Sequence, residues 1–123
     1  MSPNDPIVYV VLNGELNMSP GKAAAQAVHA SSMLPSIGKF GKYLVRTVIT
    51  LEAKNTQQIL NLHTYLKKAS VPSDYYIDEG VNEVGAYSVT ALAVGPMRMS
   101  DEEARAILKP FPLFGKKKKW WKR

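Results

Sequence analysis

Three polar side chains recur along one predicted helix at a spacing that forms a binding surface. Lys22, Gln26 and His29 are four and three residues apart, so they share one helix face. Lys22 lies in the first turn, where a cation opposes the helix dipole but suits a bound phosphate or an oxyanion. Since Lys22 and His29 are about 10 Å apart along the axis, we expect a groove that contacts an extended ligand.

Two further side chains have the chemistry of an acid–base or substrate-binding site. Asp78 ends a predicted strand and is followed by Glu79 and Gly80, a position where a carboxylate can orient or deprotonate water. Thr90 is a hydroxyl in an otherwise apolar strand, and a buried hydroxyl needs a hydrogen-bond partner. Spacing alone leaves open whether Thr90 bonds a ligand or its neighbours.

A purely structural interpretation exists for the helix residues as well. Lys22 can point into water. His29 can be a hydrogen-bonded, partly buried histidine, and the spacing by itself favours that interpretation. His63 lies among polar residues of a second predicted helix, and we interpret it as a surface residue.

The residue types exclude several kinds of chemistry. The chain has no cysteine, which excludes disulfides, thiolate metal sites and cysteine nucleophiles. Its sequence contains no phosphate-binding glycine loop, no nucleophile elbow and no pair of histidines at metal-ligand spacing. We therefore expect no metal, no cofactor and no covalent intermediate.

Apolar patterning and end signals predict the elements that position these residues. Ser19 is a suitable N-cap for an alanine-rich helix, which can pack close to a sheet. Asn55 with Gln58, and Ser100 with Glu103, are capping pairs for two further helices. Strands are expected at residues 7–12, 44–51, 75–78 and 89–94, and helices at about 20–33, 56–69 and 101–109.

The order strand, helix, strand, helix, strand, strand, helix predicts a small α/β fold. The first two crossovers are long enough for parallel strands joined through a helix. About ten residues join the last two strands, so these are either antiparallel or not adjacent. We expect a single domain over residues 1–115, with a mixed four-stranded sheet and helices on its faces.

The net charge of +6 comes from a C-terminal tail. Residues 116–123 hold six basic residues and both tryptophans, whereas residues 1–115 carry equal numbers of basic and acidic residues. Such a tail can bind phosphates and unpaired bases, lie on an anionic membrane, or remain a solvated charged run. The N-terminus is polar and no apolar run approaches ~20 residues, so we expect a soluble, cytoplasmic protein without a transmembrane segment.

Two segments of the chain combine into a recognisable signature. The first follows an apolar strand and reads MSPGKAAAQAVHA, from Met18 to Ala30. The second is Asp78-Glu79-Gly80, followed after a loop by SVTALAVGP from Ser88 to Pro96. Together they resemble the type II peptidyl-tRNA hydrolases, whose motifs are Met-x-x-Gly-Lys with Ala-Gln and His-Ala, then Asp-Ala-Gly and a Ser/Thr-Val-Thr strand ending in Gly-Pro. The resemblance covers residues 7–110 and excludes the tail.

This resemblance implies a small α/β fold with a mixed four-stranded sheet and a metal-independent enzyme. The family hydrolyses the ester that joins a peptide to the terminal ribose of tRNA, and thereby recycles tRNA from stalled translation. Its functional lysine, aspartate and strand threonine fall on Lys22, Asp78 and Thr90. Its members can pair as homodimers. The candidate substrate-binding residues are Gln26, His29 and Ser88.

The chain departs from the family pattern after Gly80. Val81, Asn82 and Glu83 stand where the family usually has Arg-Thr-Gln. The family's threonine is a proposed catalytic residue, and Asn82 replaces its hydroxyl with an amide that still donates and accepts hydrogen bonds. The lost arginine and the added Glu83 weaken phosphate contacts nearby. Activity is then reduced, the substrate differs, or the chain has become a binding protein.

Our first hypothesis is therefore an esterase acting on peptidyl-tRNA. Lys22 binds a phosphate or stabilises the oxyanion, and Asp78 orients or deprotonates water. Thr90 and Asn82 hold that water or the ester carbonyl. The alternatives are a tRNA- or RNA-binding module without catalysis, or an interaction domain recruited by its tail to an acidic partner or membrane. The residues expected to contact RNA are Lys39, Lys42, Arg46, Lys116, Lys117, Lys118, Lys119, Trp120 and Trp121.

Overall fold

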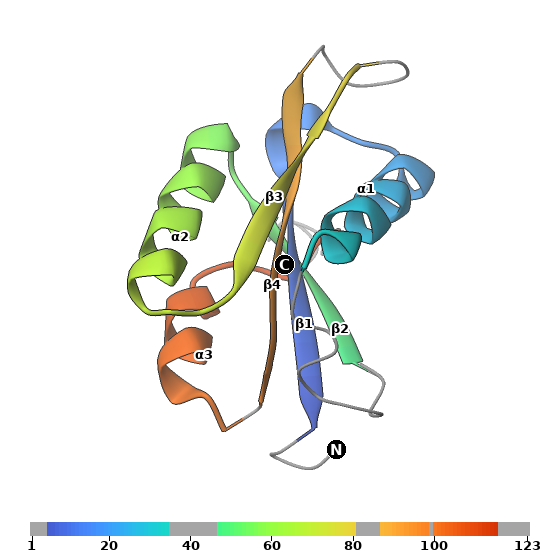
Figure 1. Ribbon diagram of the computed structural model, residues 1–123. Coiled ribbons are helices and arrows are strands. Elements are labelled where there is room, and N and C mark those ends of the chain that lie inside the picture. Colours follow the sequence, from blue (N-terminus) through green and yellow to red (C-terminus); the bar gives the residue numbers. More distant parts are fainter. Residues whose placement is uncertain (1–4, 35–46, 81–86, 99, 116–123) are drawn as a thin grey trace, which may run out of the picture.

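A computed structural model of the chain describes residues 5–34, 47–80, 87–98 and 100–115 (Figure 1). These residues form four strands, three α-helices and one short 3-10 helix. Their bounds are β1 Pro6–Asn13, η1 Gly14–Leu16, α1 Pro20–Ser32, β2 Thr47–Ala53, α2 Thr56–Lys68, β3 Ser73–Asp78, β4 Ser88–Arg98 and α3 Glu102–Leu108. Among the described helices, none is long and apolar enough to cross a membrane.

The strands form one mixed sheet in the order β2-β1-β4-β3. β1 is parallel to β2, with Tyr9 opposite Ile49, and antiparallel to β4, with Val10 opposite Ala93. β3 and β4 are antiparallel neighbours, which was one of the two arrangements the sequence left open. β2 and β3 are the two edge strands, with β1 and β4 between them, so the second crossover does not join paired strands. The predicted α/β class with a mixed four-stranded sheet is confirmed.

Helices cover both faces of this sheet, α1 on one face and α2 with α3 on the other (Figure 1). Every residue of β1 is buried, as its unbroken apolar run predicts for a central strand. Val8, Val10 and Leu12 pack toward α1, whereas the alternate residues belong to the core under α2 and α3. Ala23 and Ala30 are the buried apolar residues of α1, so small side chains let this helix approach the sheet.

The predicted starts of the first two helices are confirmed. The Ser19 hydroxyl accepts a hydrogen bond from the Lys22 backbone N–H at 3.2 Å. The Asn55 side chain accepts one from the Gln58 backbone N–H at 2.9 Å. The Gln58 side chain in turn accepts from the N–H of Lys54 at 2.7 Å, so two free N–H groups are satisfied reciprocally.

The predicted capping box of the last helix is wrong. Asp101, not Ser100, is the N-cap of α3, and its side chain makes no capping hydrogen bond with the described residues. The helix is held instead by its buried residues Ala104 and Leu108, which belong to the core shared with α2. Tertiary packing therefore overrides the local pairing of Ser100 with Glu103.

Several element bounds also differ from the predictions. Residues 14–16, expected as loop, form a turn of 3-10 helix whose start is capped by the Asn13 side chain. β2 ends two residues later than predicted, at Ala53, and β3 starts two residues earlier than predicted, at Ser73. Residues 44–46, the predicted start of the second strand, lie outside the described residues. β4 continues to Arg98 through Gly95, which has a φ of +113°. A Cβ at Gly95 would lie 2.9 Å from the Ile7 carbonyl oxygen, so only glycine fits there.

Asn13 connects three elements at the carboxyl end of β1. Its fully buried side chain donates to the Thr56 hydroxyl at 3.0 Å and to the Val89 carbonyl at 2.9 Å. Its oxygen accepts from the Glu15 backbone N–H at 3.1 Å. These bonds satisfy a buried amide and fix the start of α2 and of β4 relative to β1.

The segment after α3 returns to the edge of the sheet. Leu113 is bridged antiparallel to Leu51 of β2. The Glu52 N–H donates to the Pro112 carbonyl at 2.8 Å, and the Phe114 N–H donates to the Thr50 carbonyl at 2.9 Å. The chain therefore covers part of the β2 edge immediately before the basic tail, whose residues lie outside the described residues.

His63 is not the surface residue that its neighbours in sequence indicated. It is half-buried, its Nδ1 atom lies 2.8 Å from the Ser73 hydroxyl, and its ring is edge-on to Tyr75. Burial lowers the pKa of His63 below its ordinary value of 6.5, Lys67 lowers it further, and Asp74 opposes both effects.

This lowered pKa predicts a pH-dependent loss of stability. Because the folded state binds the His63 proton less readily than the unfolded state, protonation favours unfolding. The contribution of His63 is present above pH 6.5 and is lost as the pH falls through the lower pKa of the folded state. In urea unfolding between about pH 7.5 and pH 5, His63→Gln should lose less stability than the unsubstituted protein. An equal loss in both proteins would show that His63 does not titrate in this way.

Candidate active site

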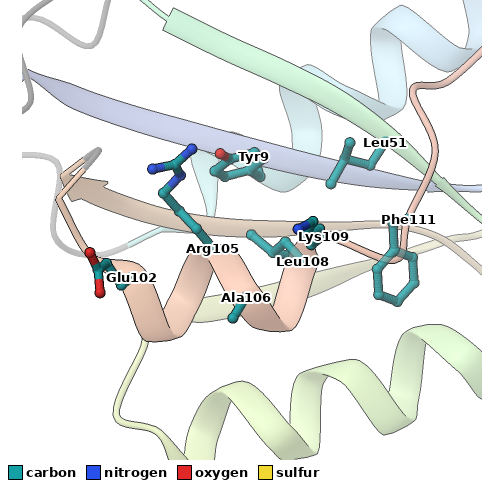
Figure 2. A pocket seen from close by; sticks show the side chains of 8 residues that line it. All are labelled: Tyr9, Leu51, Glu102, Arg105, Ala106, Leu108, Lys109 and Phe111. Carbon is teal, nitrogen blue, oxygen red and sulfur yellow. The ribbon is translucent and has the colours of Figure 1, made fainter.

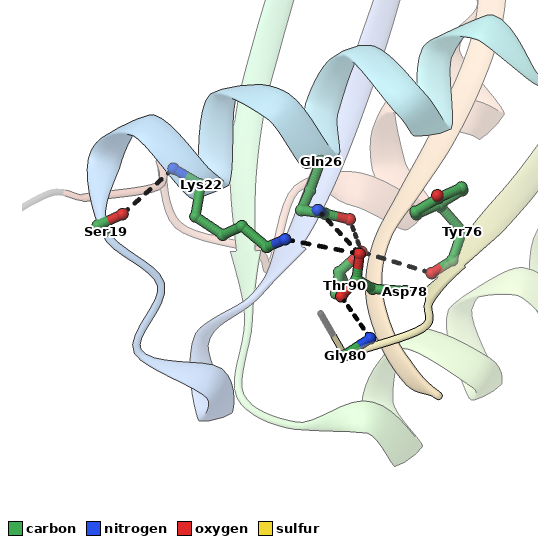
Figure 3. Close-up of polar contacts among 7 residues, drawn as sticks. All are labelled: Ser19, Lys22, Gln26, Tyr76, Asp78, Gly80 and Thr90. Carbon is green, nitrogen blue, oxygen red and sulfur yellow. Dashed lines mark hydrogen bonds and ion pairs between the residues drawn. The ribbon is translucent and has the colours of Figure 1, made fainter. Parts of the chain in front are cut away.

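Helix α1 and strand β3 bring Lys22 and Asp78 together. The Nζ atom of Lys22 lies 3.5 Å from Oδ1 of Asp78, and the two side chains are only 10% and 12% exposed (Figure 3). The interpretation of Lys22 as a residue that points into water is therefore wrong. The carboxylate of Asp78 compensates the lysine charge that the positive end of the helix disfavours.

Gln26 extends this pair into the protein. Its Nε2 atom lies 3.5 Å from Asp78 Oδ1, and its Oε1 atom accepts a 2.5 Å hydrogen bond from the Thr90 hydroxyl. Gln26 and Thr90 are fully buried, so their polar atoms need hydrogen-bond partners within the protein. The Thr90 hydroxyl also lies 3.5 Å from the carbonyl oxygen of Tyr76. Lys22, Asp78, Gln26 and Thr90 thus form one connected network, which we call the polar cluster.

The second oxygen of Asp78 fixes the turn that follows β3. Its Oδ2 atom accepts a 2.9 Å hydrogen bond from the Gly80 backbone N–H. Gly80 has a φ of +82°, which glycine adopts without strain. The carboxylate is therefore held in one orientation, with Oδ1 toward Lys22 and Gln26. An ionised carboxylate with fixed partners is suited to orienting or deprotonating water.

His29 lies one helical turn beyond Gln26 but does not belong to the hydrogen-bonded network. It is exposed rather than partly buried, and its ring stacks on Tyr76 with centroids 4.7 Å apart and planes 17° apart. Tyr76 was not among the site residues predicted from the sequence. The available signal was the alternation along β3, which gives Tyr76 and Asp78 the same face of the sheet.

Ser88 is the first residue of β4 and lies opposite Asp78 in the strand register. It is half-buried and lies two residues before Thr90. The other predicted site residues lie outside the described residues. These are Asn82, Lys39, Lys42, Arg46, Lys116, Lys117, Lys118, Lys119, Trp120 and Trp121.

The described side chains contain no group of three or more metal-binding residues placed to hold an ion. A hollow of about 430 Å³ does lie on the other face of the sheet, beside α3 (Figure 2). The polar cluster is the candidate active site, because buried ionic and polar groups converge there. The hollow is lined by Tyr9, Leu51, Glu102, Arg105, Ala106, Leu108, Lys109 and Phe111.

Comparison with known proteins gives the same family as the two sequence motifs that contain the residues of this cluster. A family model described as peptidyl-tRNA hydrolase PTH2 matches residues 7–114. The chain belongs to this family. The match confirms the resemblance noted in the sequence and extends it through the segment paired with β2. The basic tail from Lys116 lies outside the match.

Named relatives support the same assignment. The chain is 32% identical to a peptidyl-tRNA hydrolase of Methanopyrus kandleri over 111 residues, 85% of this chain and 94% of that protein. It is 34% identical to a peptidyl-tRNA hydrolase of Pyrobaculum aerophilum over 97 residues, 71% of this chain and 81% of that protein. It is 30% identical to a probable peptidyl-tRNA hydrolase 2 of Dictyostelium discoideum over 113 residues, 85% of this chain and 53% of that protein.

The buried bond between Thr90 and Gln26 yields a stability prediction. Thr90→Val keeps the shape but leaves the Gln26 oxygen buried without its donor, which should lower the free energy of unfolding by about 1–3 kcal/mol. Adding Gln26→Leu removes the unsatisfied oxygen, so the double variant should be more stable than the sum of the two single effects predicts. Urea unfolding of the three variants measures this coupling. Strictly additive effects would show that the bond contributes nothing.

Proposed function

We propose that this protein hydrolyses the ester between the peptide and the terminal ribose of peptidyl-tRNA at the polar cluster. The observation that carries the proposal is the 3.5 Å pairing of Lys22 with Asp78 beside the buried bond of Gln26 with Thr90. The family's functional lysine, aspartate and threonine correspond to three of these four residues. Membership in the peptidyl-tRNA hydrolase PTH2 family supplies the substrate class.

In the proposed reaction, Asp78 orients a water molecule and accepts its proton as the oxygen attacks the ester carbonyl carbon. Lys22 stabilises the negative charge that develops on the carbonyl oxygen. The bond from carbon to the ribose oxygen then breaks, and the proton passes to that leaving oxygen. The products are a free peptide with a terminal carboxyl group and a tRNA with a free ribose hydroxyl. No cofactor takes part in this scheme.

We expected Thr90 to hold the water or the ester carbonyl, but its hydroxyl is fully buried and donates to Gln26. In our scheme Gln26 and Thr90 are therefore positioning residues for the Asp78 carboxylate. The Thr90 hydroxyl holds the Gln26 oxygen, which directs the amide nitrogen of Gln26 toward Asp78. Asn82 remains our candidate for holding the water or the ester carbonyl, and Ser88, opposite Asp78 in the register, remains a candidate substrate-binding residue. His29 remains our candidate for contacting the substrate beside the cluster.

The basic segments supply the proposed attraction for the tRNA backbone. Lys39, Lys42 and Arg46 form one such segment, and residues 116–123 form the second, with two aromatic rings among six cations. Cations neutralise phosphates, and exposed rings stack on unpaired bases. We further propose a cytoplasmic location, where translation supplies the substrate. The resemblance also implies a homodimer, which sedimentation would detect.

The first functional prediction concerns the ion pair. Lys22→Gln and Asp78→Asn keep similar shapes but remove the charges, so each should lower kcat/KM for peptidyl-tRNA by at least about 100-fold. Release of labelled peptide by purified protein measures this loss, and circular dichroism checks the fold. Lys68→Ala, which removes an exposed cation of α2, is the matched control and should retain turnover.

Two results would contradict parts of this proposal. Unchanged turnover in one of the two variants would remove that residue from the mechanism. A protein without these substitutions that binds tRNA tightly but releases no peptide would contradict hydrolysis. It would instead support an RNA-binding module whose loop at Val81, Asn82 and Glu83 no longer sustains catalysis.

The second functional prediction concerns the tail. Deleting residues 116–123 should weaken tRNA binding and reduce the slope of log affinity against log salt by up to about 4–5, because six cations are lost. Replacing Trp120 and Trp121 with leucine keeps those cations, so it should weaken binding without changing the slope. Filter binding over a salt series measures both quantities. An unchanged slope after the deletion would mean that the tail does not contact the backbone.

A further inference from the structure

A preformed aromatic platform lies next to the polar cluster. The rings of His29 and Tyr76 are stacked at 4.7 Å, and the two rings come from different elements, α1 and β3. Tyr76 is half-buried and packs against the core under α1, whereas His29 is exposed. Tyr76 is therefore the supporting inner ring, and His29 is the outer ring available to a ligand.

The platform has a fixed position relative to the polar cluster. Tyr76 and Asp78 are two residues apart on the same face of β3, which is about 6.6 Å along the strand. His29 is three residues beyond Gln26, which is about 4.5 Å along the helix axis. The Tyr76 carbonyl oxygen also contacts the Thr90 hydroxyl at 3.5 Å. A ligand held on the His29 ring is thus placed beside the carboxylate of Asp78.

The substrate class of the proposed function provides a partner for such a ring. The ribose that carries the ester also carries a nucleobase, and only the sugar ring separates the two groups. We propose that His29, supported by Tyr76, stacks on the nucleobase of the terminal nucleotide and so positions the ester at Asp78. This inference rests on the proposed hydrolysis of peptidyl-tRNA.

The chemistry favours the nucleobase over the peptide as the stacked group. A terminal nucleobase is present in every peptidyl-tRNA, whereas the side chains of the peptide vary from one substrate to the next. A permanent ring platform suits the invariant group, and stacking of a base on an aromatic side chain depends little on base identity. Holding the base also limits the freedom of the attached ribose, which favours attack on the ester.

The test compares two substrates that differ only in this base. One is N-acetylalanyl-tRNA, and the other is the same molecule with an abasic terminal ribose. The unsubstituted protein should cleave the first with a kcat/KM roughly 5- to 150-fold higher, the range expected for one stacked base. His29→Leu should lose most of this preference by slowing cleavage of the intact substrate alone. His29→Phe should keep it, because a ring without nitrogen atoms still stacks.

Two further variants separate stacking from general structural effects. Tyr76→Leu removes the supporting ring and should reduce the preference, with Asp78 retained. The control is His63→Leu, because His63 also contacts a tyrosine ring, Tyr75, but does so edge-on in the core on the opposite face of the sheet. This variant should leave the preference unchanged.

The outcomes distinguish this inference from the proposed function. Equal cleavage of both substrates by the unsubstituted protein would overturn the stacking inference and leave the hydrolase proposal intact. A preference that survives His29→Leu, or that His29→Phe abolishes, would also overturn it. Failure to cleave the intact substrate would overturn the proposed function itself.

Discussion

The arrangement of α1 over the sheet depends on the partners of one buried carboxylate, that of Asp78 at the end of an edge strand. Asp78 ends β3 with little exposure to solvent, and a buried charge is tolerated only with a counter-ion and hydrogen-bond donors. Lys22 supplies the charge, while Gln26 and Gly80 supply N–H groups. This requirement explains why a cation occupies the first turn of α1. It also ties the position of the helix to the end of an edge strand.

The same groups that form the proposed catalytic centre also hold α1 against β4. Most of the interface between α1 and the sheet is apolar, with small residues such as Ala23 and Ala30 allowing close approach. The bond between Thr90 and Gln26 places two polar side chains inside that interface, where neither has access to water. A hydrogen-bonded polar pair in a packed core favours one relative position of helix and sheet. The stability of the interface between α1 and the sheet is therefore coupled to the orientation of the Asp78 carboxylate.

The sequence by itself determined the features that arise from residues close together in the chain. The N-caps Ser19 and Asn55 act on the N–H groups three residues ahead, so a short window contains all the information. The unbroken apolar run of β1 required burial on both faces of the strand, whichever strands pair with it. The motifs around Lys22 and Asp78 indicated the family through residue types alone, and the family match confirmed it.

Tertiary structure decided what depends on residues far apart in the chain. The Thr90 bond to Gln26 spans 64 positions, and no local pattern indicates which buried hydroxyl faces which amide. The stack of His29 on Tyr76 and the burial of His63 depend on how the helices are placed over β3. The capping box expected for Ser100 failed because packing of α3 in the core outweighed a local hydrogen bond. Spacing along the chain limits which side chains share a face, but only the arrangement of the elements determines which side chains meet across them.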